Sequence, residues 1–150
     1  MTILVNETEI RDAEIGREMQ YHPAGSQEDA WFLAAQSLVV RQLLLQRAAE
    51  AGLCETPASV VPGEGEEELI DRLLQIDVNV PEADEATCQR YYDRHPDSFT
   101  ERGSGGRVPF ARVHARIRDY LHTKAMRIAV AEYIRALSNT ATIRGFDLGG

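Results

Sequence analysis

The spacing of apolar residues predicts a mainly α-helical chain with about five helices, and one long helix is expected at residues 26–51. Ser26, with Asp29 three residues later, resembles a capping box, and Gly52 follows where this helix should end. Apolar residues are spread too widely around this helix for a single stripe. We therefore expect it to be the central core helix.

Three shorter helices are expected at residues 12–21, 66–77 and 84–94. Asp12 and Asp84 stand where a side chain can cap a helix, and a His-Pro pair follows the first and the last of the three. The middle one opens on an acidic run, which the helix dipole favours. Helices should therefore fill most of the chain between its two ends.

The last helix is expected at residues 109–137, with Pro109 at its first position. It carries one apolar stripe along its length and a second along its latter half, made of Met126, Val130, Tyr133 and Leu137. Two apolar faces need two partners. One partner is the core of the chain; the other is the same core, the terminal strands, a second subunit or a client polypeptide.

Short strands are expected at both ends of the chain. Residues 3–5, followed by a polar turn and Ile10, read as one strand, and residues 141–148 alternate as another that is broken at Gly145. Each strand needs a partner, and the only other candidate lies at the opposite terminus. We expect the two ends to pair and to form a small β element that closes a single domain.

The composition of the chain is that of a soluble globular protein, with 150 residues of which 43% are hydrophobic and 27% charged. Neither a secretory signal nor a membrane span is recognised, so a cytoplasmic location is expected. Residues 1–99 carry 20 acidic and 7 basic side chains, whereas residues 100–150 carry 4 and 9. This asymmetry favours packing of the basic segment against the acidic part of its own chain or of a twin subunit, and not nucleic-acid binding.

The histidines, the cysteines and the glycine-rich segment form no pattern that is typical of a catalytic, cofactor or metal site. The histidines lie at positions 22, 95, 114 and 122, and the last two are eight residues apart, which is too far to share an ion from one helix face. Cys54 and Cys88 are expected to be reduced. The glycines at 103, 105 and 106 lack the Lys-Ser/Thr of a phosphate loop and are read as a flexible linker.

Five segments, in order along the chain, carry a resemblance to a known family. They are residues 5–10, 13–23, 38–49, 80–99 and 109–143, and the fourth ends in the run Tyr91-Tyr-Asp-Arg-His-Pro-Asp-Ser-Phe99. Together they resemble the non-catalytic part of the NifM and SurA type of parvulin-family folding factors. Nearly the whole chain is covered.

The resemblance implies that residues 1–150 form one SurA-like chaperone module with a small strand element. In that family a parvulin prolyl isomerase domain is inserted between the positions of Phe99 and Pro109, but here residues 100–108 form a short linker instead. The resemblance therefore implies no isomerase activity. Glu7 replaces the glycine that usually follows Val5-Asn6 in the family.

Two classes of function follow. The first, which we favour, is a non-catalytic chaperone or assembly factor for a protein client, with a nitrogenase component as the example that the resemblance supplies. Its predicted client surface is the second apolar stripe of the last helix, flanked by Arg127 and Arg135, with Tyr133 as the anchor; a homodimer is a further possibility for this surface. The alternative is a constitutive structural or accessory subunit of an enzyme complex.

Overall fold

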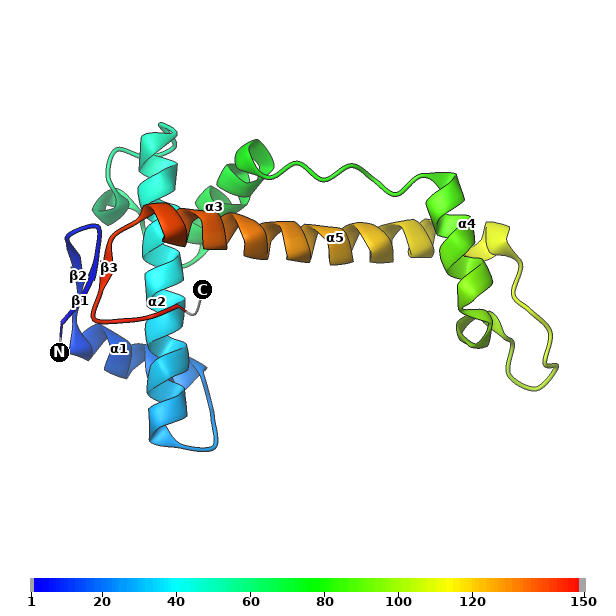
Figure 1. Cartoon of the computed structure of the whole chain (residues 1–150), viewed down its shortest axis with the longest axis horizontal. Coiled ribbons are helices and arrows are strands. Elements are labelled where there is room, and N and C mark those ends of the chain that lie inside the picture. The colour runs from blue at the N-terminus through cyan, green and yellow to red at the C-terminus, as the bar shows by residue number, and fades with distance from the viewer. Residues whose placement is uncertain (1, 149–150) are drawn as a thin grey trace. The chain divides into compact units, whose positions relative to one another are not determined.

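The computed structural model describes residues 2–148, and its described part is mainly α-helical with a small antiparallel sheet (Figure 1). The predicted fold class is confirmed. The chain divides into two compact units: a terminal unit of residues 1–77 and 131–150, and a middle unit of residues 78–130. The assignment of the whole chain to one module stays a prediction.

The sheet joins the two ends of the chain, as predicted. Its strands are β1 (Ile3–Val5), β2 (Thr8–Ile10) and β3 (Ile143–Arg144), in the order β2-β1-β3. β3 pairs antiparallel with β1, and the backbone N–H of Asn6 donates to the Thr142 carbonyl oxygen at 2.8 Å (Figure 1). β2 adds a hairpin, and the strand predicted at residues 141–148 shortens to two residues.

Three helices build the terminal unit: α1 (Asp12–Glu18), α2 (Gln27–Glu50) and α3 (Glu64–Asp77). The Ser26 cap is confirmed, because its hydroxyl oxygen accepts from the backbone N–H of Asp29 at 3.1 Å. The predicted Asp12 cap is wrong: Arg11 is the capping residue and Asp12 opens the helix. The sheet, α1 and the first part of α2 share one core cluster, and the latter part of α2 shares a second with α3.

The middle unit contains α4 (Glu85–Arg94) and most of α5 (Phe110–Thr140). Asp84 caps α4 as predicted, accepting from the Thr87 backbone N–H at 2.8 Å. The core of this unit is formed by buried side chains from both helices: Cys88, Tyr92, Val113 and Ile117.

The segment between α4 and α5 is a closed loop and not the open linker that we expected. Thr100 and Arg107 form an antiparallel bridge, and the Val108 N–H donates to the Phe99 carbonyl oxygen at 2.7 Å. The Arg107 guanidinium lies 4.0 Å from the centre of the Tyr92 ring and donates to the Tyr92 carbonyl oxygen. These contacts hold both ends of the loop against the core of the middle unit.

Candidate functional site

Two members of the predicted client-binding stripe are internal to the terminal unit. Tyr133 and Leu137 are partly buried and pack against the cluster that α2 and α3 form, and Leu137 also contacts the cluster beside the sheet. The core of their own chain therefore covers part of these two side chains, and their assignment to a client surface stays a prediction.

The hydroxyl of Tyr133 also takes part in a polar network. It donates to Asp77 at 2.5 Å, and Asp77 accepts from Arg47 Nε at 2.8 Å. The hydrogen bonds from Arg47 and Tyr133 lower the pKa of Asp77, whereas burial and the nearby carboxylate raise the pKa of Tyr133 to about 12. This arrangement holds the ring of Tyr133, which belongs to α5, against α2 and α3, so it does not suit the predicted role as a client anchor.

The other four predicted residues are divided between the two units. Met126 and Val130 are partly buried and Arg127 is exposed, all within the middle unit. Arg135 is exposed in the terminal unit, where it lines a cleft. Of the predicted site, Arg135 lines this cleft of the terminal unit, and Leu137 lines a smaller hollow of the same unit, about 110 Å³ in volume.

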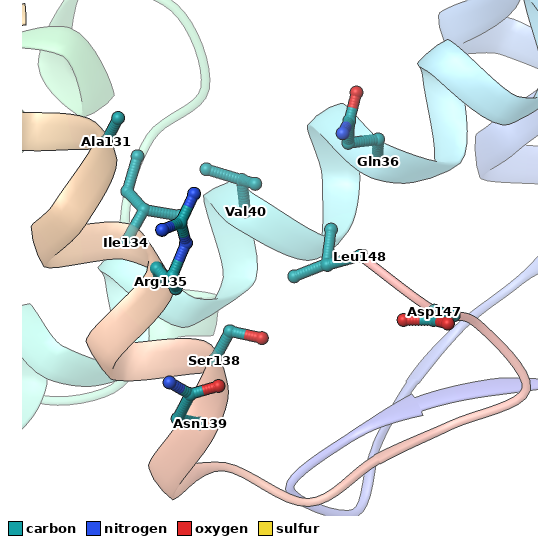
Figure 2. A pocket seen from close by; sticks show the side chains of 9 residues that line it. All are labelled: Gln36, Val40, Ala131, Ile134, Arg135, Ser138, Asn139, Asp147 and Leu148. Carbon is teal, nitrogen blue, oxygen red and sulfur yellow. The ribbon is translucent and has the colours of Figure 1, made fainter. Parts of the chain in front are cut away.

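This cleft has a volume of about 270 Å³ and is formed by α2, the end of α5 and the segment after β3 (Figure 2). Figure 2 shows Val40 of α2, Ile134 of α5 and Leu148 as its apolar contributors. Polar side chains from the same three elements surround them: Gln36, Arg135, Ser138, Asn139 and Asp147. The cleft therefore offers apolar contact together with amide, hydroxyl and charged groups.

An aromatic patch lies near the start of α2. It consists of Trp31 and Phe32, which are both exposed, together with Phe146. The ring of Phe146 lies 5.2 Å from that of Phe32 and 6.3 Å from that of Trp31, measured between centroids. The three rings of Trp31, Phe32 and Phe146 cover one another only in part, because Phe32 is still 44% exposed.

The patch and the cleft are continuous along α2. Phe32, Gln36 and Val40 follow one another at intervals of four residues, which places them on successive turns of one helix face. The aromatic patch therefore leads into the cleft, and together they form an elongated surface that we call the α2 surface. Such a surface can bind an apolar polypeptide segment and hydrogen-bond to its polar groups.

The sequence predicts that the helix at residues 26–51 is the central core helix, and this prediction implies that Trp31 and Phe32 are buried. The signal that they lie outside the core was present, because α2 carries apolar residues around most of its circumference and neighbouring elements cannot cover every side of a helix. The partner of the patch, Phe146, was assigned to a terminal strand. It lies instead after β3, where the chain turns back along α2.

No chemical centre accompanies this surface in the described part of the chain. Residues 2–148 contain no cluster of three or more His, Cys, Asp and Glu side chains that could hold a metal ion. Cys54 and Cys88 are free thiols, and burial raises the pKa of Cys88. The arrangement of the α2 surface suits binding.

Comparison with protein-family models, with curated proteins and with solved structures finds no match for the chain. The resemblance to NifM and SurA type folding factors therefore stays a prediction. Within residues 2–148, no helix combines the length and the apolar character needed to cross a membrane.

Proposed function

We propose that the protein is a non-catalytic chaperone or assembly factor that binds an apolar segment of a protein client on the α2 surface. The observation that carries the proposal is the exposed aromatic pair Trp31 and Phe32, which meets Phe146, together with the cleft one helical turn further along α2. Exposed aromatic side chains beside a cleft are a feature of protein-interaction sites.

The resemblance to NifM and SurA type modules supports the same class of function and adds a type of client. It suggests an immature metalloenzyme, such as a nitrogenase component, in the cytoplasm. The mixed lining of the cleft suits an unfolded or partly folded client, because such a segment presents apolar side chains together with unpaired backbone groups.

Trp31 provides a direct assay, because it is the only tryptophan of the chain and belongs to the patch. Its emission should shift to shorter wavelength when a reduced, unfolded model protein such as insulin is added, since binding removes the indole from water. The protein should also suppress the light scattering of the aggregating insulin.

The variant Phe32→Ser should weaken both effects, because it removes an exposed ring from the centre of the patch. Ile76→Ser is the matched control: Ile76 is a 60% exposed apolar residue on α3, outside the patch and the cleft. If both variants suppress aggregation as well as the original chain, the α2 surface does not bind clients.

The stability and solubility of the purified chain alone distinguish the alternative function, that of a constitutive subunit. A constitutive subunit should be unstable or insoluble without its partner, because a permanent interface is large and apolar. A chain that stays folded and monomeric or dimeric alone, and that binds unfolded insulin reversibly, supports the chaperone proposal.

A further inference from the structure

A second hollow lies entirely within the middle unit, with a volume of about 280 Å³. Aromatic side chains from three segments line it: Tyr91 of α4, Phe99 of the turn that follows, and Tyr120 of α5. The ring centroids of Tyr91 and Tyr120 lie 5.6 Å apart, and those of Tyr91 and Phe99 lie 6.1 Å apart. Ile117, which is buried in the core of the unit, completes the apolar lining.

The lining of this hollow suits one side chain, because it is mostly apolar and aromatic. Aromatic rings pack favourably edge-to-face against one another, so an aromatic side chain fits against Tyr120 and Phe99. Tyr120 is 51% exposed, which leaves part of its ring uncovered in the isolated chain.

Positive charge surrounds the hollow on the α5 side. Arg116 lines it directly, and Lys124 and Arg127 follow on the same face of the helix, four and seven residues after Tyr120. All three cations are exposed, and within residues 2–148 none of them has an ion pair or a hydrogen bond from its side chain. By contrast, Arg112 on the preceding turn pairs with Glu101 at 3.5 Å.

We propose that this hollow is a docking site for an acidic peptide segment, which packs one aromatic side chain against the uncovered part of Tyr120 beside Phe99 and places a carboxylate on Arg116. Arginine is suited to this contact because its planar guanidinium binds a carboxylate through two parallel hydrogen bonds. Lys124 and Arg127 would attract further acidic residues of the same segment and speed its association.

The charge pattern favours a peptide over a nucleic-acid strand. The middle unit carries nine Lys and Arg residues against seven Asp and Glu, a net charge of only +2. Asp97 precedes Ser98 at the edge of the hollow, and Asp119 precedes Tyr120. A continuous phosphate backbone would meet these carboxylates, whereas a short peptide can avoid them. The site lies in the middle unit and does not rest on the function proposed for the α2 surface.

The test measures fluorescence anisotropy with a fluorescein-labelled peptide of glutamates and glycines that contains one phenylalanine. A second peptide replaces the phenylalanine with alanine, a third replaces the glutamates with lysines, and a labelled oligothymidylate represents single-stranded nucleic acid. We expect the full chain to bind the first probe most tightly and to lose affinity as the salt concentration rises.

Arg116→Glu should weaken binding of the first peptide by roughly tenfold or more, the range expected when a charge-assisted hydrogen bond is lost. Tyr120→Ala should weaken it as well. Arg102→Glu is the control, because Arg102 is an exposed arginine of the same unit that does not line the hollow and its replacement changes the net charge equally. Arg116 is on the surface, so its variant should fold, and circular dichroism checks this.

Three results would overturn the proposal. The first is equal binding of the acidic peptide by the Arg116→Glu and Arg102→Glu variants. The second is binding of the acidic peptide no tighter than that of its alanine or lysine counterparts, which includes no binding at all. The third is a preference for the oligothymidylate, which would assign the hollow to base stacking.

Discussion

Replacement of Tyr133 by phenylalanine tests whether this residue belongs to the core or to a binding surface. The variant keeps the ring, which packs against the α2–α3 cluster, and removes only the hydroxyl that donates to Asp77 at 2.5 Å. A hydrogen bond to a charged group contributes about 1.5–3 kcal/mol. Because Arg47 still binds Asp77 in the variant, we expect a loss near the lower end, about 1.5 kcal/mol, and a melting temperature lower by roughly 3–6 °C.

Thermal and denaturant unfolding of the original chain, Tyr133→Phe and Tyr21→Phe provide the measurement. Tyr21 is 69% exposed and forms no hydrogen bond from its hydroxyl to any described residue, so its replacement should leave stability unchanged. The same three proteins are then compared in the insulin aggregation assay. Unchanged stability of Tyr133→Phe together with lost client binding would refute the structural role and restore Tyr133 as a client anchor.

The network also predicts how stability depends on pH. The pKa of Asp77 is lowered in the folded chain, so its contribution is present above the ordinary value of 3.8 and is lost as the pH falls below it. The pKa of Tyr133 is raised from 10.0 to about 12, so its contribution is present below 10 and is lost as the pH rises towards 12. The Tyr133→Phe variant should show a smaller alkaline decline, as monitored by unfolding at several pH values, because Tyr91 and Cys88 also have raised pKa values and still contribute.

The remaining predictions concern the sheet and the loop. Glu7→Gly should stabilise the chain by about 0.5–1 kcal/mol in denaturant unfolding, because Glu7 has a φ of 73° in the β1–β2 turn, a region that glycine adopts without strain. Gly145→Ala should destabilise it by about 2 kcal/mol or more, since φ is 80° there and an added Cβ would collide with the Thr2 carbonyl group; a neutral result would mean that this segment is not packed as described. Removal of residues 141–150 should lower the melting temperature of the whole terminal unit, because side chains of this segment pack against its core. A proline-peptide assay should show no isomerase activity, because residues 100–108 form only a short closed loop; acceleration that persists without this loop would place a catalytic site elsewhere.

Local chemistry explains which parts of the fold the sequence could predict. The starts of α2 and α4 follow from the side chains of Ser26 and Asp84, each of which accepts from the backbone three residues later. The start of α1 was displaced by one residue, because an acidic side chain such as Asp12 is favourable both as a cap and in the first helical turn. The pairing of the ends was predictable because an isolated strand must find a partner, but the β1–β2 hairpin was obscured by Glu7.

The candidate site was less predictable, because exposure depends on which faces of a helix its neighbours cover. On α2, Ala34 and Ala35 are fully buried whereas the preceding Trp31, Phe32 and Leu33 are exposed. Residue type alone predicts that the large side chains are buried and the alanines are not, since large apolar side chains gain most from burial. Small residues are buried where other elements pack closely against the helix, and this proximity is a property of the tertiary structure.

The last helix shows why an apolar stripe alone does not identify a binding surface. Its two apolar faces do require partners, as the sequence indicates, and the chain itself supplies partners for part of each face. Val113 and Ile117 are buried with α4 in the middle unit, while Tyr133 and Leu137 complete the cluster of α2 and α3 in the terminal unit. The large apolar side chains that remain exposed near these contacts, Phe32 on α2 and Tyr120 on α5, lie outside the stripe that was predicted to bind. The place to look for partners is therefore the apolar area left over after each unit has formed its core, such as Phe32, one turn before Gln36 of the cleft, and Tyr120, which lines the hollow of the middle unit.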